Sequence, residues 1–216
     1  MILSNFKKRL YTSLFLFLLI YLIIKFNYIL AYSLIILGVL SILEFIQLTK
    51  KIIKKNFFFF FVNFIFILYI FIFCILFFVF NNFLQLKLIL FSLLCGCVAS
   101  DIGGFIFGKI FGGPKLTKIS PNKTISGSIG SLFLTIITIN SSIFYFTESF
   151  NLMLILIAIL TSISCQLGDL FFSFLKRKAK FKDTGKFFPG HGGALDRLDG
   201  ILLGVPIGFL SLVLLI

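Results

Sequence analysis

Residues 57–80 read FFFFFVNFIFILYIFIFCILFFVF, a stretch without a single charged side chain. An α-helix rises about 1.5 Å per residue and the hydrocarbon core of a bilayer is about 30 Å thick, so about 20 apolar residues are enough to cross it. This stretch is long enough for one crossing. Because its apolar residues cover every helical face, we predict a transmembrane helix that faces lipid over much of its surface.

The whole chain shares this apolar character. Its 216 residues are 60% hydrophobic and 12% charged, with a mean hydropathy of +1.16, whereas a soluble domain has about 25% charged residues. A soluble fold of this length could not bury so much apolar surface, which excludes a water-soluble enzyme and a disordered chain. The apolar runs predict an all-α, polytopic membrane bundle of about seven helices, at residues 10–26, 28–48, 57–80, 83–107, 126–147, 151–175 and 198–216.

The positive charges predict the orientation of this bundle. The chain has 20 Lys and Arg against 7 Asp and Glu, a net charge of +13. With seven helices, only Lys25 and Lys87 fall on one side of the membrane, and every other Lys and Arg falls on the opposite side. Cytoplasmic loops collect Lys and Arg, so we predict a cytoplasmic N-terminus. The charge is then a matter of topology, and no nucleic-acid partner is expected.

The aspartates gather near two cytoplasmic loops. Glu44 falls within the predicted helix 28–48 and Glu148 in an outer loop. A carboxylate beside a transmembrane segment costs free energy and usually has a function or a partner. The plainer alternative is that these acids only neutralise nearby lysines. All five aspartates lie at or beside the two loops, namely Asp101, Asp169, Asp183, Asp196 and Asp199.

The first loop follows the predicted helix 83–107. Residues 120–124 read SPNKT directly before the next predicted helix. A lysine and hydroxyl groups before a helix N-terminus suit an anion such as phosphate, although the spacing of a P-loop is missing. Upstream, small residues recur at every fourth position, which predicts close packing against another helix: Gly96, Ser100, Gly104, Gly108 and Gly112.

The second loop lies between the predicted helices 151–175 and 198–216. The loop reads PGHGG at residues 189–193, where His191, the only histidine, stands among glycines that let backbone approach a ligand. Asp196 and Asp199 follow, three residues apart. Acids, bases and glycine turns together indicate phosphate chemistry assisted by a hard cation. Four further polar residues share one helical face through their i, i+4, i+7 and i+8 spacing: Asp169, Ser173, Lys176 and Arg177.

Together, the two loops resemble the phosphatidate cytidylyltransferase family. The family signature is matched by SFLKR at residues 173–177, KDTG at 182–185, PGHGG at 189–193 and DRLD at 196–199. The upstream residues Asp101, Gly103 and Gly104 and the SPNKT loop are similar to a second stretch of the family. One departure is Ile125-Ser126, where the family usually has Trp-Glu.

This resemblance implies an enzyme that makes CDP-diacylglycerol and pyrophosphate from CTP and phosphatidic acid. It implies Mg²⁺, with a second cation left open, held by Asp169 and Asp196, with Asp101 and Asp199 as further metal ligands. The implied catalytic residues are Asp169, Asp196, Lys176, Arg177, His191 and Arg197. The implied substrate contacts are Ser120, Lys123, Thr124, Ser173, Lys182, Asp183, Gly192 and Gly193. Three segments remote along the chain, near residues 101, 169 and 196, would have to meet in one pocket.

The expected organisation follows from these assignments. Residues 1–90 are expected to form a lipid-facing scaffold of N-terminal membrane helices, and residues 91–216 a catalytic membrane domain with both loops. The expected location is a bacterial-type inner membrane with a cytoplasmic active site, and the expected partners are CTP, phosphatidic acid and membrane lipids, with a homodimer left open. Two other functions stay open at this point. The first is a CTP-dependent lipid kinase acting on a polyprenol, and the second, which the sequence favours less, is a cation-coupled transporter.

Overall fold

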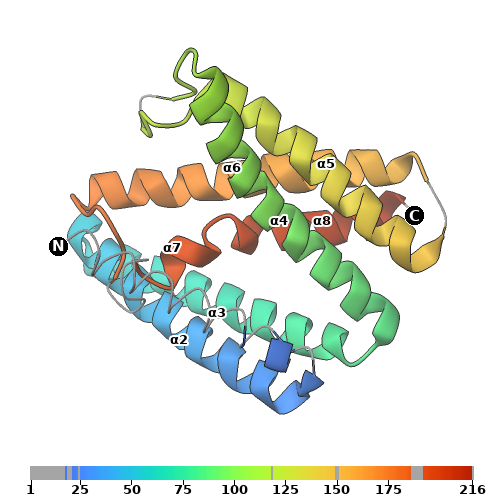
Figure 1. The fold of residues 1–216 in the computed structure, drawn as a ribbon. Helices are drawn as coiled ribbons and strands as arrows, with labels where there is room; N and C mark the ends of the chain where they lie inside the picture. The colour runs from blue at the N-terminus through green and yellow to red at the C-terminus, as the bar shows by residue number, and fades with distance from the viewer. Residues whose placement is uncertain are drawn as a thin grey trace. The chain divides into compact units, whose positions relative to one another are not determined.

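The computed structural model describes residues 18, 21–23, 25–117, 119–148, 151–185 and 192–215. Every regular element in these ranges is a helix, which confirms the predicted all-α class. An isolated β-bridge joins Lys115 to Thr124. Figure 1 shows the helices in chain order: α2 Asn27–Ile52, α3 Asn56–Asn81, α4 Leu84–Phe111, α5 Ile125–Thr147, α6 Met153–Lys178, α7 Leu195–Leu198 and α8 Ile201–Leu215.

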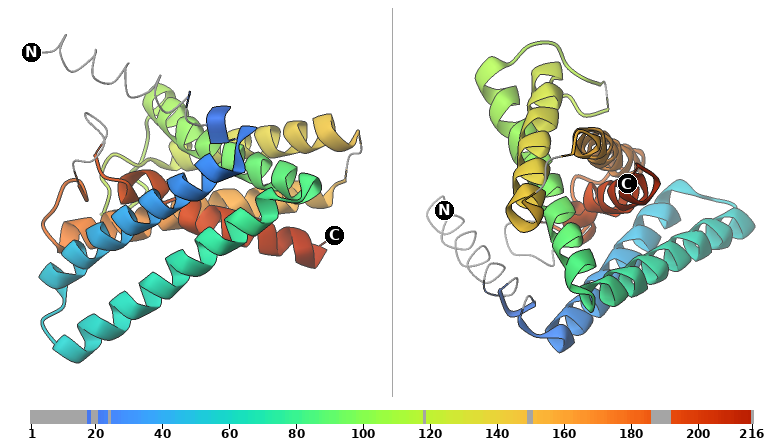
Figure 2. Two further views of the ribbon diagram at one scale, coloured as in Figure 1. Left: turned by 90° about the horizontal axis from the view of Figure 1, so that it is seen from below. Right: turned by 90° about the vertical axis from the view of Figure 1, so that its right-hand side faces the viewer.

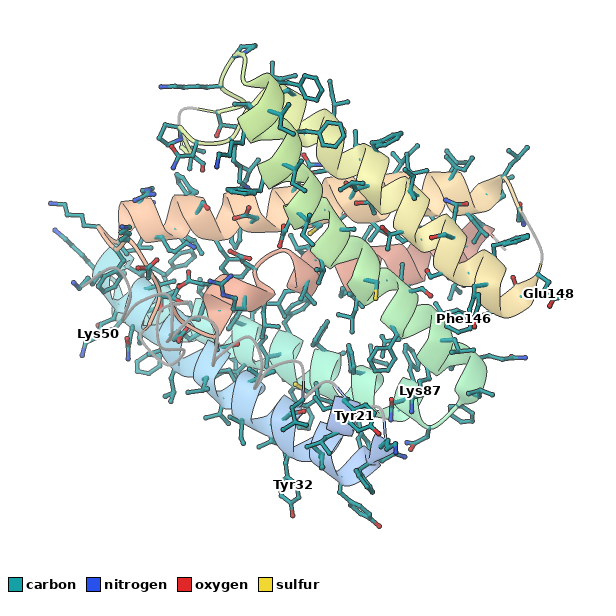
Figure 3. All side chains as sticks on the ribbon, viewed as in Figure 1. Tyr21, Tyr32, Lys50, Lys87, Phe146 and Glu148 are labelled. Atoms are coloured by element: carbon teal, nitrogen blue, oxygen red, sulfur yellow. The ribbon has the colours of Figure 1, made fainter. Side chains whose placement is uncertain are left out.

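The helices make this a multi-pass membrane protein. Within the described residues, six segments are long and apolar enough to cross a bilayer: helices α2 to α6 and the segment Leu195–Leu215. The predicted first span, residues 10–26, lies mostly outside the described residues. As predicted, α3 is exposed over most of its surface, with Phe57 85% exposed and 22% of its most apolar window buried. Exposed aromatic side chains such as Tyr32 of α2 also point outward (Figure 3).

Packing divides the chain into two compact units. The first holds the described residues up to Asn82 together with those of Leu175–Arg197, and the second holds Phe83–Phe174 and the chain from Leu198 onward. The described residues of the second loop therefore belong to the same compact unit as α2 and α3. The functional division expected at residue 90 stays a prediction.

In the first unit, α2 and α3 run side by side and antiparallel (Figures 1 and 2). Polar contacts join the pair at both ends. At one end Thr49 donates to Oδ1 of Asn63 at 3.0 Å, and at the other Asn81 donates to Oδ1 of Asn27 at 2.9 Å. These hydrogen bonds favour one register of the two helices.

In the second unit, α4 and α5 pack along the predicted stripe of small residues. A Cβ on Gly104 would lie 2.8 Å from the hydroxyl oxygen of Ser131, and that hydroxyl donates to the carbonyl of Ser100 at 2.7 Å. Gly96 and Gly108 also face α5 closely, so the predicted packing is confirmed at four of the five positions. Gly112 differs, because it ends α4 with φ 58° and ψ −140° and has no close neighbour.

The last predicted span, residues 198–216, differs from the structure in its first turns. The helix begins earlier, as the short α7, breaks after Leu198, and restarts as α8. At the break, the N–H of Gly200 donates to Oδ1 of Asp199 at 2.9 Å. Gly200 also lies against Sγ of Cys165 in α6, where a Cβ would be 2.6 Å from the sulfur. Asp196 therefore lies in α7, and Asp199 lies at the break between α7 and α8.

Candidate active site

An ion pair between Lys123 and Asp169 lies in the second unit. Lys123 belongs to the loop between α4 and α5, and Asp169 belongs to α6. Their side chains are 25% and 30% exposed. Ser173 lies one turn further along α6, and its hydroxyl donates to Oδ1 of Asp169 at 3.3 Å. The structure thus brings together three predicted site residues from two separate segments.

Backbone hydrogen bonds hold the loop that carries Lys123. Its N–H donates to the carbonyl of Ser120 at 3.1 Å, and its carbonyl accepts from the N–H of Leu116 at 2.7 Å. The next residue, Thr124, is the N-cap of α5, because its hydroxyl accepts from the N–H of Gly127 at 3.1 Å. The predicted loop is therefore an ordered turn and cap that presents Lys123 to Asp169.

Ser126 stands where the resembling family usually has an acid. Its hydroxyl donates to the carbonyl of Gly112 and lies 3.0 Å from the hydroxyl of Thr124. These contacts tie the beginning of α5 to the end of α4. The side chain of Ser126 therefore has a structural role here.

Gln166 is a polar residue to which the sequence assigned no role. The hydroxyl of Ser128 in α5 donates to its Oε1, and its Nε2 donates to the carbonyl of Ser128 and to Oγ of Ser162, both at 3.3 Å. Gln166 precedes Asp169 by three residues and so shares its helical face. That spacing, on an apolar helix, is the signal that could have found it.

A second ion pair, between Lys176 and Asp196, lies in the first unit. Nζ of Lys176 donates to Oδ1 of Asp196 at 2.7 Å, and the two side chains are 13% and 9% exposed. The other carboxylate oxygen, Oδ2, accepts from the N–H of Thr184 at 2.8 Å and of Gly193 at 3.0 Å. Both carboxylate oxygens of Asp196 are therefore engaged, Oδ1 by the last turn of α6 and Oδ2 by backbone N–H groups of the second loop.

Gly192 and Gly193, the described residues of the glycine turn, lie against this carboxylate. Gly192 has φ 88°, a left-handed backbone that disfavours any side chain. A Cβ at this position would also lie 3.0 Å from Oδ2 of Asp196. The predicted importance of Gly192 thus has a local cause in the geometry around Asp196, while its contact with substrate stays a prediction.

Glu44 of α2 also contacts the second loop. The sequence did not predict Glu44 as a site residue. Its side chain is 6% exposed. Oε2 accepts from the hydroxyl of Thr184 at 2.6 Å and the N–H of Leu195 at 2.9 Å, and Oε1 accepts from the N–H of Ala194 at 3.0 Å. An acid in the middle of an apolar helix was the only available signal. Helix α2 therefore supplies a hydrogen-bond acceptor to the second loop.

The remaining predicted residues have varied surroundings. Asp199 is 8% exposed and bonded to the N–H of Gly200. His191 lies outside the described residues. Asp101 and Asp169 belong to the second unit and Asp196 to the first, so the convergence of these three segments stays a prediction. Five predicted residues are exposed in the structure: Asp101, Arg177, Lys182, Asp183 and Arg197.

The donor chemistry of Asp169 and Asp196 suits Mg²⁺. In the described ranges, no three His, Cys, Asp or Glu side chains come together as a metal-binding group. Mg²⁺ prefers oxygen ligands and is usually held by one or two carboxylates plus substrate phosphates and water. Each aspartate alone can supply such a carboxylate, so the residues fit the ion, and the predicted metal ligands stay predictions.

These features define a multi-pass membrane protein that keeps lysine–aspartate pairs among its apolar helices. The family model described as "Cytidylyltransferase family" matches residues 2–215, almost the whole chain. The protein therefore belongs to the cytidylyltransferase family.

Several curated proteins named phosphatidate cytidylyltransferase are similar to this chain. The protein of Helicobacter pylori (strain J99) is 43% identical over 113 residues, which cover 52% of this chain and 42% of the relative. The protein of Staphylococcus haemolyticus is 44% identical over 110 residues, 50% of this chain and 42% of the relative. That of Staphylococcus aureus (strain COL) is 41% identical over 110 residues, with the same coverage. The aligned part of the chain thus spans less than half the length of these relatives.

Proposed function

We propose that this protein transfers the cytidylyl group of CTP to phosphatidic acid, forming CDP-diacylglycerol and pyrophosphate. The observation that carries the proposal is the pairing of Lys123 with Asp169 and of Lys176 with Asp196. Lys123, Lys176 and Asp196 stand at positions of the family motifs, and the resemblance also assigns Asp169 to the site. The names of the similar bacterial proteins support the same reaction.

The reaction requires positioning and charge neutralisation more than proton transfer. A phosphate oxygen of phosphatidic acid bonds to the α-phosphorus of CTP, and the bond from that phosphorus to the oxygen bridging to the β-phosphorus breaks. Pyrophosphate leaves with that bridging oxygen. The nucleophile is already an anion, so no strong base is needed. Placing the two anions together is the main difficulty, and lysines can offset their repulsion.

Lys123 and Lys176 are the side chains we assign to this task. Each ammonium is held by an aspartate, which fixes where its positive charge lies before substrate arrives. Asp169 and Asp196 would hold Mg²⁺, which when bound supplies further positive charge to the phosphates. Ser173 orients Asp169 through its hydroxyl.

We place the reaction at the cytoplasmic face of a bacterial-type inner membrane. Lys123 lies in the loop before α5 and Lys176 in the last turn of α6. Both belong to the positively charged side, which the positive-inside rule assigns to the cytoplasm. CTP would reach that side from water, and phosphatidic acid would arrive within the membrane. A homodimer stays a prediction.

The test uses purified protein and CTP labelled on either the α- or the γ-phosphate, with and without Mg²⁺. With phosphatidic acid, we expect the α-label to enter the lipid and pyrophosphate to be released. With diacylglycerol, which lacks the phosphate nucleophile, we expect no labelled lipid. Transfer of the γ-label to diacylglycerol or to a polyprenol would instead identify a lipid kinase. No transfer of either label to any lipid would overturn the proposal.

A further inference from the structure

The carboxylate of Glu44 is the meeting point of three hydrogen bonds from the second loop. The donors are the hydroxyl of Thr184 and the N–H groups of Ala194 and Leu195, at 2.6, 3.0 and 2.9 Å. Glu44 belongs to α2, 140 residues or more before any of them in the chain. None of these contacts is needed to hold α2 against α3, which have their own polar contacts.

These three donors are neutral, although Glu44 is buried. A buried carboxylate is costly unless hydrogen bonds compensate the loss of water. Both ion pairs of the described residues involve other acids, Asp169 and Asp196. The carboxylate of Glu44 is therefore stabilised by the loop, and the loop in turn depends on the carboxylate.

Two glycines of the family motif lie against the same carboxylate. A Cβ on Gly185 would overlap Oε1 of Glu44, and a Cβ on Gly193 would overlap both Glu44 and the hydroxyl of Thr184. The space that Glu44 occupies thus requires glycine at both positions. Glu44, which lies far outside the motif in the chain, therefore explains why the motif has glycine at positions 185 and 193.

Glu44 and Asp196 hold the same segment from two directions. The N–H of Thr184 donates to Asp196 while its hydroxyl donates to Glu44. Gly193 donates to Asp196, and the next two residues donate to Glu44. If the hydrogen bonds to Glu44 were lost, the N–H groups of Thr184 and Gly193 that donate to Oδ2 of Asp196 would also shift. Oδ1 of Asp196 would then lose its fixed direction toward Lys176.

We propose that Glu44 is a positioning residue that holds the second loop so that Asp196 aligns the ammonium of Lys176. This inference rests on the proposed function for what Lys176 does, and on the hydrogen bonds alone for how the loop is held.

The first experiment measures the loop directly and needs no substrate. Glu44→Gln keeps the size of the side chain but replaces one carboxylate oxygen by an NH₂ group, which would face an N–H donor from Ala194 or Leu195. We expect amide hydrogen exchange in residues 192–198 to become at least about tenfold faster. The control is Ser41→Ala, which changes a buried residue of α2 outside this group. Equal exchange in the Glu44→Gln and Ser41→Ala proteins would overturn the inference.

The second experiment measures coupling to Lys176. In the CTP and phosphatidic acid assay, we expect Glu44→Gln to lower kcat about tenfold or more. When Glu44→Gln is combined with Lys176→Met, kcat should fall little below that of Lys176→Met alone. Both changes disrupt the same feature, the alignment of the Lys176 ammonium by Asp196. A purely structural role would instead give losses that multiply, and that result would overturn the inference.

A third experiment separates local alignment from folding with two variants of Thr184. Thr184→Ser keeps the hydroxyl that donates to Glu44 and should retain activity, whereas Thr184→Val removes it and should lower kcat. Equal activity of these two variants would also count against the inference. If the unmodified protein transfers no label to phosphatidic acid while the exchange result holds, the proposed function fails and the loop contact stands.

Discussion

Gly168 of α6 lies directly against the backbone of Asp199, so that a Cβ built on Gly168 would be 2.5 Å from the carbonyl oxygen of Asp199. This contact sits beside Asp169 and at the break between α7 and α8. A backbone carbonyl cannot rotate away as a side chain can. The position therefore has no room for any other residue.

We predict that Gly168→Ala destabilises the protein by about 1–3 kcal/mol, as overpacking of a tight contact does. The measurement is unfolding of the detergent-solubilised protein by heat or denaturant. Gly38→Ala in α2 is the matched control, because its new Cβ would lie 3.3 Å from the nearest side-chain atoms, which can adjust. Equal stability of the two variants would contradict the prediction.

Neutralising Lys123 should weaken the use of CTP. Lys123→Met keeps the aliphatic stem and removes the charge that Asp169 orients. We expect the KM for CTP to rise about tenfold or more, the scale of a lost hydrogen bond to a charged group. Lys115→Met, an exposed lysine of the same loop, is the control and should leave KM nearly unchanged. An unchanged KM in Lys123→Met would remove this loop from the nucleotide site.

Replacing either paired aspartate should abolish CDP-diacylglycerol formation. Asp169→Asn and Asp196→Asn keep side-chain size but remove the negative charge that orients each lysine and is proposed to bind Mg²⁺. Both proteins should still insert into the membrane, which fractionation checks. Glu148→Gln, at the end of α5, should behave as the unmodified protein. Near-normal turnover in either asparagine variant would refute the role assigned to that aspartate.

The membrane orientation can be tested by thiol labelling from each side. In a variant in which Ser replaces the four native cysteines, Lys50→Cys and Glu148→Cys place single thiols at the ends of α2 and α5 that Figure 3 labels. A reagent that cannot cross the membrane should reach residue 148 in intact cells and residue 50 only in inverted vesicles. The reverse pattern would place the proposed site on the outer face.

Local sequence properties determined most of the helical architecture. The apolar run at residues 57–80 predicted α3 to within one residue at each end, because hydropathy is a property of neighbouring residues. The small-residue stripe similarly predicted the face of α4 that packs on α5, although only the structure identified α5 as the partner and removed Gly112 from the stripe.

The sequence also identified candidate site residues, but it did not identify all the residues that hold them in place. The polar patterning and the family resemblance together singled out Lys123, Asp169, Lys176 and Asp196. Only the tertiary structure decided which lysine pairs with which aspartate, that the last span breaks at Asp199, and that Glu44 holds the second loop. The physical reason is that a hydrogen bond between groups more than a hundred residues apart depends on how whole helices pack, and no periodicity or hydropathy of nearby residues records that packing.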